Sequence, residues 1–291
     1  MLHVSPRQLQ VFVQVVAGGS LRAAADALHM TQPAASMALA ELEKTLGAAL
    51  FDRERGRLHL NPHGREVLPL AQELLERHAE LGRVATRADT GLAGELRIGT
   101  SNTVGNYRVG ELLGGFVRAH PQVALRLRVG NTGEIAQALL DHQLDLACVE
   151  GPVVHPELEA RAWREDALVV CVPPGHRLAA AATLRPRDFA DQRWILREPG
   201  SATRSQSEQA LVKLPPPRAV LELSQTEAIK QAVAAGLGIA CLPEVAIREA
   251  VAAGQLIALA TPFLDLRRRL SLLVPRKRYR GAALAAFLRM A

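Results

Sequence analysis

The chain of 291 residues is 48% hydrophobic and 22% charged, with a formal net charge of +6. This length is too great for one small helical module and sufficient for two or more domains with their own cores. No stretch approaches the roughly 20 uninterrupted apolar residues that cross a bilayer, and Arg7 and Gln10 interrupt the N-terminal apolar residues. We therefore expect a cytoplasmic protein without a signal peptide or a membrane partner.

Three short amphipathic helices are predicted in the first fifty residues. Ser5 can cap the first, Ser20 the second and Thr31 the third, while Gly18–Gly19 ends the first and His29–Met30 forms the turn before the third. Apolar or small side chains recur at helical spacing in each helix, which predicts one shared core. The third helix then has an outward face of small and amide-bearing side chains: Gln32, Ser36, Met37 and Ala40.

This outward face is suited to the major groove of DNA. Small side chains let a helix lie deep in the groove, where Gln pairs with adenine and a hydroxyl with several base edges. The alternative is a solvated helix face, since short amphipathic helices are common. The following segment favours DNA, because Asp52–Leu60 is predicted as a β-hairpin wing with Gly56 in its turn. Its arginines are placed to meet phosphates: Arg53, Arg55 and Arg57.

Residues 5–65 resemble the winged helix-turn-helix of the LysR-type transcriptional regulators. The resemblance is carried by Leu9, Phe12, Gly19-Ser20, Ala23-Ala24-Ala25, Leu28, Gln32-Pro33-Ala34, Ser36, Leu42-Glu43, Leu46-Gly47, Leu50-Phe51, Arg53 and Gly64. It implies that DNA is contacted by Thr31, Gln32, Pro33 and Ser36, and that Arg53 meets the DNA backbone. Many relatives carry a polar or basic residue beyond Ser36, where this chain has Met37 and Ala38, so no base preference is implied.

Net charge does not identify a partner. Residues 1–93 contain ten Lys and Arg against ten Asp and Glu, so the whole excess of positive charge lies in residues 94–291. DNA binding would then use helix N-termini and a local basic cluster: Lys44, Arg53, Arg55, Arg57 and Arg65. The late basic runs Arg267–Arg269 and Arg276–Arg280 are interpreted as a solvated edge or a subunit contact.

A long helix is predicted from about His63 to Thr86, with Asn61 as its cap and Pro62 at its first position. Residues at alternating spacings of four and three form a seam that predicts pairing with a symmetry mate: Val67, Ala71, Leu74, His78, Leu81 and Ala85. The alternative is a helix that lies on its own domain. Two DNA-binding heads joined by one seam would recognise a two-fold site. Asp89–Gly94 is predicted as a hinge.

From Glu95 the pattern changes to alternating strands and helices, which predicts a mostly parallel sheet covered by helices. The first set has strands at 96–99, 123–129 and 144–149. The second set has strands at 167–172, 194–196, 220–223 and 238–242, and a last strand at 270–274 precedes a helix at 281–289. The predicted fold class is therefore α/β with two lobes, preceded by an all-α-type winged helix-turn-helix domain.

Ligands of such folds bind at the carboxyl ends of the strands, where helix N-termini supply free N–H groups. The loops placed there offer hydroxyls, amides and one cation, which suits a small anion or carboxylate. Only two Trp and two Tyr occur, which also favours a small polar ligand. The alternative is that Ser and Thr only cap their helices. The predicted effector-binding residues are Thr100, Ser101, Asn102, Thr103, Asn131, Thr132, Glu150, Gly200, Ser201, Thr203 and Arg204.

The resemblance to LysR-type regulators extends over nearly the full length. It implies an effector domain like the two-lobed periplasmic binding proteins, with the last strand and helix returning to the first lobe. The implied division is a DNA-binding domain at 1–62, a linker helix and hinge at 63–93, and an effector domain at 94–291. Its first lobe spans about 94–165 plus 268–291 and its second about 166–267. The runs at 129–132, 149–152, 194–198 and 227–230 look most like members tied to sulfur assimilation and carbon fixation.

The implied function is transcriptional regulation by a small, anionic metabolite, for which a sulfur oxyanion such as sulfite or a carboxylate is the candidate. The expected partners are double-stranded promoter DNA and further copies of the chain, in a homodimer or a homotetramer arranged as a dimer of dimers. The expected mechanism is cleft closure on the ligand, altered packing of the effector domains, and a changed spacing or bend of the bound DNA.

Two other classes of protein stay open. An enzyme has little support, since the chain has no GxGxxG, P-loop or HExxH motif, and neither a cofactor nor a metal is predicted. A solute-binding protein of the periplasmic type would match the C-terminal lobes, but it does not account for residues 1–90. Cys148, Cys171 and Cys241 lie in apolar runs without paired spacing, which favours buried reduced thiols over a redox or metal site.

Overall fold

The N-terminal part of the computed structural model is built from three helices, α1 (Pro6–Gly18), α2 (Leu21–Ala27) and α3 (Gln32–Leu46). The structure describes residues 3–54, 57–86 and 92–291 of the chain. The three predicted caps are confirmed: the hydroxyls of Ser5, Ser20 and Thr31 accept backbone N–H groups in the first turns of these helices. Each cap satisfies an N–H that has no partner within its helix, so local chemistry sets where the helices begin.

One apolar core joins the three helices to the wing. Phe12 and Leu42 are fully buried, and the ring of Phe12 packs edge-on against Phe51 with 5.7 Å between centroids. The predicted hairpin is confirmed as β1 (Phe51–Glu54) paired with β2 (Arg57–Leu60). Its predicted turn, with Arg55 and Gly56, lies outside the described residues.

The long helix α4 (Pro62–Thr86) starts where it was predicted, since the side-chain oxygen of Asn61 accepts the N–H of Gly64 at 2.7 Å. Its first half belongs to the N-terminal core, in which Leu68 and Ala71 are each 1% exposed. The predicted pairing seam is therefore wrong for Ala71, and the side chain of Ala85 is not described. Two leucines of the predicted seam are exposed, Leu74 (56%) and Leu81 (67%), and so is Leu70 (61%).

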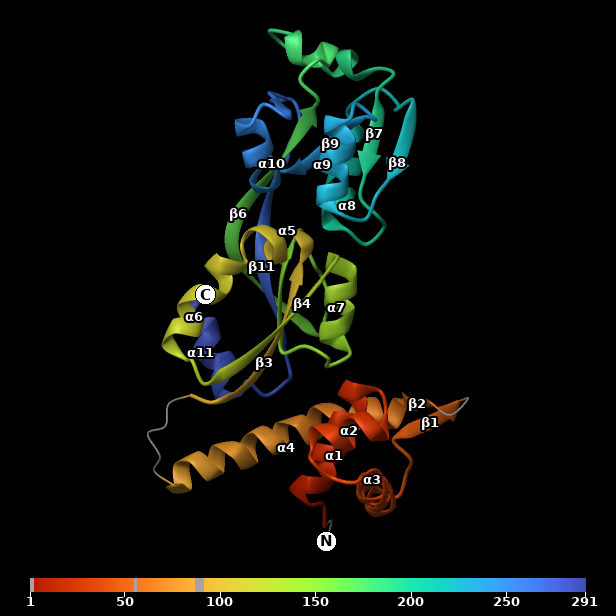
Figure 1. Cartoon of the computed structure of the whole chain (residues 1–291), viewed down its shortest axis with the longest axis vertical. Helices are drawn as coiled ribbons and strands as arrows, with labels where there is room; N and C mark the ends of the chain where they lie inside the picture. The colour runs from red at the N-terminus through yellow and green to blue at the C-terminus, as the bar shows by residue number, and fades with distance from the viewer. Residues whose placement is uncertain (1–2, 55–56, 87–91) are drawn as a thin grey trace.

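One mixed sheet runs through both lobes of the remaining chain (Figure 1). Three parallel strands build the centre of each lobe: β3 (Gly94–Ser101), β4 (Val123–Gly130) and β5 (Leu146–Glu150) in the first, and β7 (Arg193–Leu196), β8 (Ala219–Glu222) and β9 (Ile239–Pro243) in the second. Two longer antiparallel strands connect the lobes: β6 (Leu158–Val172) and β11 (Arg267–Pro275). The implied return of the last strand is confirmed, because β11 also pairs with β5.

Helices cover both faces of this sheet. The first lobe has α5 (Asn102–Tyr107), α6 (Val109–Ala119), α7 (Thr132–Leu140) and α11 (Ala282–Met290), and the second has α8 (Ala202–Leu211), α9 (Thr226–Ala234) and α10 (Glu244–Ala252). Among the described residues, no helix combines the length and apolarity that crossing a membrane requires.

The sequence did not predict α10, the edge strand β10 (Ile257–Leu259), two 3₁₀ turns or the first half of β6. The 3₁₀ turns lie at Arg177–Ala180 and Pro186–Phe189. In β6, residues 159–165 are mostly exposed and rich in charge, so the strand lacks the apolar alternation on which strand prediction depends. Pairing with β11 holds this segment extended.

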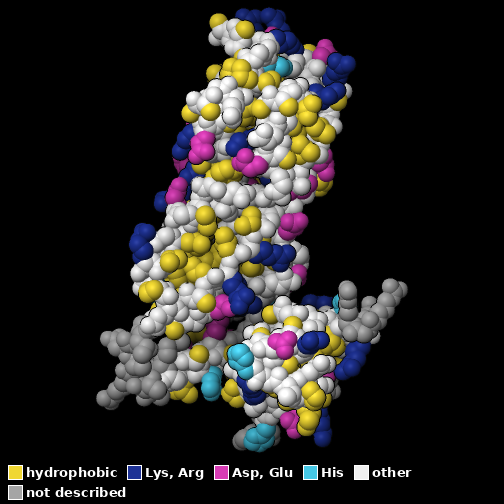
Figure 2. Space-filling view, viewed as in Figure 1, with side chains coloured by type: hydrophobic (Ala, Val, Ile, Leu, Met, Phe, Trp, Pro, Cys, Tyr) yellow, Lys and Arg dark blue, Asp and Glu magenta, His cyan; other side chains and the backbone are white. Residues whose placement is uncertain are grey.

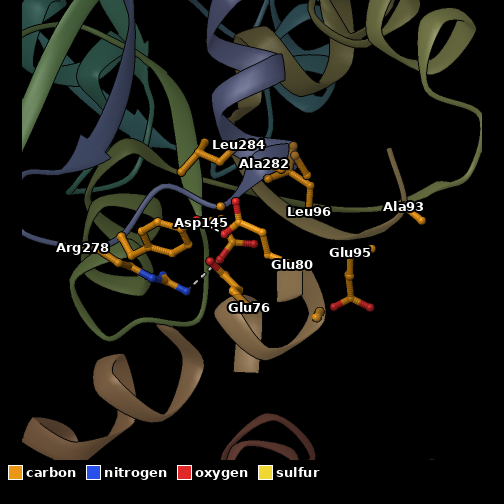
Figure 3. A pocket seen from close by; sticks show the side chains of 14 residues that line it. Glu76, Glu80, Ala93, Glu95, Leu96, Asp145, Arg278, Ala282 and Leu284 are labelled. Atoms are coloured by element: carbon orange, nitrogen blue, oxygen red, sulfur yellow. Dashed lines mark hydrogen bonds and ion pairs between the residues drawn. The ribbon is translucent and has the colours of Figure 1, made fainter. Parts of the chain in front are cut away.

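The helix α4 also contacts the first lobe, at a cavity of about 110 Å³ (Figure 3). Arg278, which follows β11, donates a hydrogen bond to Asp145 at 2.9 Å. Glu76 of α4 extends toward this pair, and one of its carboxylate oxygens is buried with no hydrogen-bond partner among the described residues. Burial raises the pKa of Glu76 above its ordinary value. The hydroxyl of Tyr279 donates to Glu80 of the same helix at 2.7 Å, which joins the linker helix to the lobe.

Gly64 leaves no room for a side chain. A Cβ there would lie 2.2 Å from the carbonyl oxygen of Leu50, whereas a Cβ at Gly110 in α6 would meet nothing within 4 Å. We expect Gly64→Ala to lower the free energy of unfolding by about 1–3 kcal/mol through overpacking. Gly110→Ala is the matched control and should be neutral or raise it by up to about 1 kcal/mol. Urea denaturation followed by circular dichroism measures both, and equal effects would contradict this explanation.

Candidate functional site

The outward face of α3 is accessible. Gln32 and Pro33 are exposed and Ser36 is half-buried, while Ala35 and Leu39 on the opposite side are buried in the core. In Figure 1, α3 lies on the side of the N-terminal domain that faces away from the two lobes, with the wing beside it. We call Gln32, Pro33 and Ser36 the reading face. Thr31, the remaining predicted residue of α3, is exposed and caps the helix.

The wing supplies one described cation next to the reading face. Arg53 is exposed in β1, Arg55 lies outside the described residues, and the side chain of Arg57 is not described. Basic and acidic side chains are interspersed over the face of the molecule drawn in Figure 2. This agrees with the formally neutral composition of residues 1–93 and leaves any positive potential for DNA to local groups.

The predicted effector-binding residues of the first lobe come together at the carboxyl ends of β3, β4 and β5. Thr100, Ser101 and Thr103 are fully buried, and the hydroxyls of Thr100 and Ser101 have no hydrogen-bond partner among the described residues. Asn102 donates to the carbonyl of Gly130. Thr132 donates to the backbone carbonyl of Glu150. Buried hydroxyls without partners are rare in proteins, which makes this edge of the sheet a candidate ligand site.

The second lobe meets this edge through the first turn of α8. Ser201 is 2% exposed and caps α8, and Thr203 is 1% exposed. The backbone N–H of Gly133 in α7 donates to the carbonyl of Gly200 at 3.0 Å, a direct hydrogen bond between the lobes. Asn131 caps α7, and its side-chain oxygen would lie 3.1 Å from a Cβ at Gly200. The predicted capping role therefore holds for Ser201, and Asn131 caps its helix as well.

Arg268 is the central cation of this cleft. Its guanidinium donates to Asp166 at 2.7 Å, to Thr203 at 2.9 Å and to Thr103 at 3.1 Å, each through a different nitrogen. The side chains of Arg268 and Asp166 are 3% and 2% exposed. Because Thr103 and Thr203 belong to helices of opposite lobes, this one side chain bridges the cleft. A guanidinium has five N–H donors, so two of them take no part in these three bonds.

The interpretation of Arg267–Arg269 as a solvated edge or subunit contact is wrong for Arg268. A strand alternates its faces, so Leu266, Arg268 and Leu270 share one side of the chain, and both leucines are buried. Asp166 likewise continues the buried series of Leu168 and Val170 in β6. Period-two spacing predicts that both residues are buried. A run of three adjacent arginines is also typical of an exposed charged segment, and that pattern is the stronger one in the sequence.

Arg204, the predicted cation of the site, is engaged elsewhere. Its guanidinium pairs with Glu208 at 2.8 Å and with Glu222 at 2.5 Å, and it also donates to the carbonyl of Arg197. The structure thus places Arg204 at a carboxylate pair on the second lobe. The bridging position between the lobes is taken by Arg268.

Two further features define the cleft. Tyr107 of α5 donates to Glu227 of α9, which links the lobes a second time. A cavity of about 730 Å³ lies between α7, α8 and β11, and includes Thr132 and Gly200 in its lining. Arg267, Arg268 and Arg269 also line it, and no Asp or Glu from the described part of the chain does. The cavity therefore favours anions.

The three cysteines are buried and free, as predicted. Burial raises the pKa of Cys171 and of Cys241 to about 12, and it also raises the pKa of Cys148. A thiol that stays protonated at neutral pH is a poor nucleophile and a poor metal ligand.

Two family models match the chain. The model described as "LysR substrate binding domain" matches residues 89–291, and the one described as "Bacterial regulatory helix-turn-helix protein, lysR family" matches residues 6–65. The second match accounts for the part of the chain that a solute-binding protein would lack, so that alternative is not supported.

Curated relatives agree over the whole length. The HTH-type transcriptional regulator YeiE of Escherichia coli (strain K12) is 38% identical, covering 99% of this chain and 97% of the relative. The RuBisCO operon transcriptional regulator of Allochromatium vinosum is 32% identical, covering 98% and 95%. The regulator CbbR of Sinorhizobium medicae (strain WSM419) is 35% identical, covering 92% and 86%. These relatives are transcriptional regulators and not enzymes, and the second is named for the RuBisCO operon.

Solved structures share the fold. A full-length OxyR variant from Pseudomonas aeruginosa has a TM-score of 0.79 at 24% identity, covering 99% of this chain and 94% of that one. The regulatory domain of Synechocystis CcmR has a TM-score of 0.62 at 28% identity, covering 67% and 94%. The chain therefore belongs to the LysR family and is a transcriptional regulator with an N-terminal helix-turn-helix domain that binds DNA and a C-terminal domain that binds an effector.

Proposed function

We propose that this regulator senses a small anion in the cleft between its lobes and responds by changing the geometry of its oligomer on promoter DNA. The observation that carries the proposal is Arg268, a buried cation with two further N–H donors held between hydroxyls of both lobes. An anion bound there would make charge-assisted hydrogen bonds in a site of low dielectric. The domain bounds proposed for this function are 1–62, 63–93 and 94–291.

The chemistry of the cleft supports a sulfur oxyanion or a carboxylate. The first turns of α7 and α8 lie at the cavity that Arg267–Arg269 line, and the N-terminal end of a helix favours negative charge. The CcmR domain, at 28% identity, was solved in complex with 2-PG. The protein would act in the cytoplasm, where promoter DNA is found.

A continuous route connects the cleft to the linker helix. The strand β11 carries Arg268 near its first residue, and Arg278 follows shortly after its last. Arg278 lies beside Asp145 and Glu76 at the contact with α4 (Figure 3). Closure of the cleft would pull on β11 and shift the first lobe against α4. The effector can change DNA binding only if it binds one of these arrangements more tightly than the other.

The oligomer proposed is a dimer paired through α4 and, in turn, a dimer of dimers. Leu70, Leu74 and Leu81 expose more than half of their surface on one helix, which is unusual for a protein that functions as a monomer. A second apolar area lies over α6 and α11, with Val117 and Met290 about half exposed (Figure 2). Two distinct apolar surfaces on one chain suit an assembly with two kinds of interface.

Substitutions on the reading face test DNA recognition. We expect Gln32→Ala to weaken binding to a target promoter fragment by about 1–3 kcal/mol, with little effect on unrelated DNA, because Gln reads base edges. Arg53→Ala should weaken binding to both and lower the slope of affinity against salt by about one ion. Arg248→Ala, a charge change at an exposed position on α10, is the control. Fluorescence anisotropy at several salt concentrations measures these values, and equal losses on both DNAs for Gln32→Ala would contradict base reading.

Charges on the exposed leucine face of α4 test the oligomer. Leu74→Glu together with Leu81→Glu should shift sedimentation toward the monomer and weaken promoter binding, since two half-sites would no longer be held together. Val212→Glu introduces a negative charge at a side chain that is 84% exposed and does not line the cavity, and it should change neither measurement. An unchanged sedimentation coefficient for the double variant would place the dimer contact elsewhere.

Arg268 and its partner test the anion site. Arg268→Met should weaken binding of sulfite or 2-PG at least about tenfold, since hydrogen bonds to charged groups contribute about 1.5–3 kcal/mol each. Asp166→Asn keeps the cation and removes its carboxylate, so it should bind anions at least as tightly as the unsubstituted protein. Isothermal titration of the full-length protein measures both. Circular dichroism checks folding, and the same affinity in Arg268→Met would exclude Arg268 as a ligand.

A further inference from the structure

Glu150 is a buried carboxylate in the same cleft, and only one of its two oxygens is satisfied. It lies at the end of β5 and is 2% exposed. One oxygen accepts the hydroxyl of Thr103 at 3.0 Å, and the other is buried with no hydrogen-bond partner among the described residues. A buried acceptor left unpaired is destabilising, and more so when it is charged. Such a group calls for a donor that the surrounding side chains do not supply.

The hydroxyl of Thr103 links this carboxylate to the cation of the cleft. It donates to Glu150 and accepts from Arg268, so its single proton is already used. The other described hydrogen bonds of Arg268 are donated to Asp166 and Thr203. Glu150 does not itself line the 730 Å³ cavity, but it is bonded to the same threonine as Arg268. A ligand that takes the remaining N–H donors of Arg268 would therefore lie near the free acceptor oxygen of Glu150.

The guanidinium of Arg268 and the carboxylate of Glu150 favour opposite properties in a ligand. The guanidinium selects a negative charge, while a carboxylate oxygen repels a bare anion and accepts only a proton-bearing group. An anion that carries a proton or a hydroxyl satisfies both groups. An anion with no hydrogen to donate leaves Glu150 unpaired and places two negative charges side by side. Sites built to bind a ligand hydroxyl reject analogues without it by about 10⁴-fold or more.

We propose that Glu150 is a specificity-determining residue that restricts the effector to anions bearing a hydrogen-bond donor. This inference rests on the proposed function, since it assumes that the anion binds beside Arg268. Two ligand chemistries meet the requirement: an oxyanion that keeps a proton near neutral pH, such as hydrogen sulfite or hydrogen phosphate, and a carboxylate with an adjacent hydroxyl. Sulfate and simple carboxylates are excluded, because neither carries a donor at this pH.

Matched pairs of anions test the proposal on the full-length protein at neutral pH and constant ionic strength. The first pair is phosphate against sulfate, with sulfite as a second proton-bearing oxyanion, and the second pair is glycolate against acetate. By isothermal titration, the donor-bearing member of at least one pair should bind at least about 100-fold more tightly than its partner. The pair with the larger ratio identifies whether the proton belongs to an oxyanion or to a hydroxyl.

A variant tests whether Glu150 causes the selectivity. Glu150→Gln has nearly the same shape, but its amide can donate, so sulfate or acetate should gain at least about tenfold in affinity and the ratio within the pair should shrink. Glu165→Gln removes one charge from an exposed position on β6 and should leave every ratio unchanged. Circular dichroism and the retained affinity for the donor-free anion show that the variant is folded.

The possible outcomes separate this inference from the proposed function. Equal affinity within both pairs, or a ratio that Glu150→Gln leaves unchanged, would overturn the role of Glu150 while anion sensing stands. Absence of binding by every anion tested would instead overturn the proposed anion function, and this inference with it. Loss of the preference in Glu150→Gln, with the preference intact in Glu165→Gln, would support both.

Discussion

The ion pair between Arg268 and Asp166 is the constraint on which the two-lobed domain depends. The residues face each other across the two strands that connect the lobes, and both are almost fully buried. Leaving one buried charge without its partner costs about 3–5 kcal/mol, so the pair holds β6 and β11 in register where the lobes meet. The remaining N–H groups of Arg268 reach Thr103 and Thr203 on opposite lobes. Opening of the cleft must therefore break hydrogen bonds of the same cation that we propose binds the effector.

The linker helix α4 has three faces with different surroundings. Leu68 and Ala71 are part of the DNA-binding core, Glu76 lies at the buried charges of the first lobe, and Leu74 remains exposed. The three faces of this helix meet the DNA-binding core, the first lobe and, at Leu74, solvent. Because the helix is continuous, it couples the two domains without a flexible joint along its length. In the proposed mechanism, a shift of the first lobe would therefore move α3, which presents the reading face.

Much of the local structure could be predicted from residue type and spacing. Ser5, Ser20 and Thr31 cap their helices as expected, because an N-cap is a contact between residues three positions apart. The hydroxyl loops at the ends of the parallel strands also came together, since the carboxyl ends of such strands share one edge of a sheet. The seam of α4 was only partly predictable. Heptad spacing identifies the apolar positions, but it does not say whether the N-terminal core or a second copy of α4 covers them.

By itself, the sequence determined the helix caps, the wing, the two α/β lobes and the polar character of the cleft, all of which follow from contacts or periodicities within one segment. Only the tertiary structure decided that Arg268 bridges the lobes, that Arg204 pairs with Glu208 and Glu222, and that one oxygen of Glu150 stays without a partner. The reason is physical: a charged side chain takes its role from the partners that folding places within about 3 Å, and those partners lie up to 165 residues away along the chain.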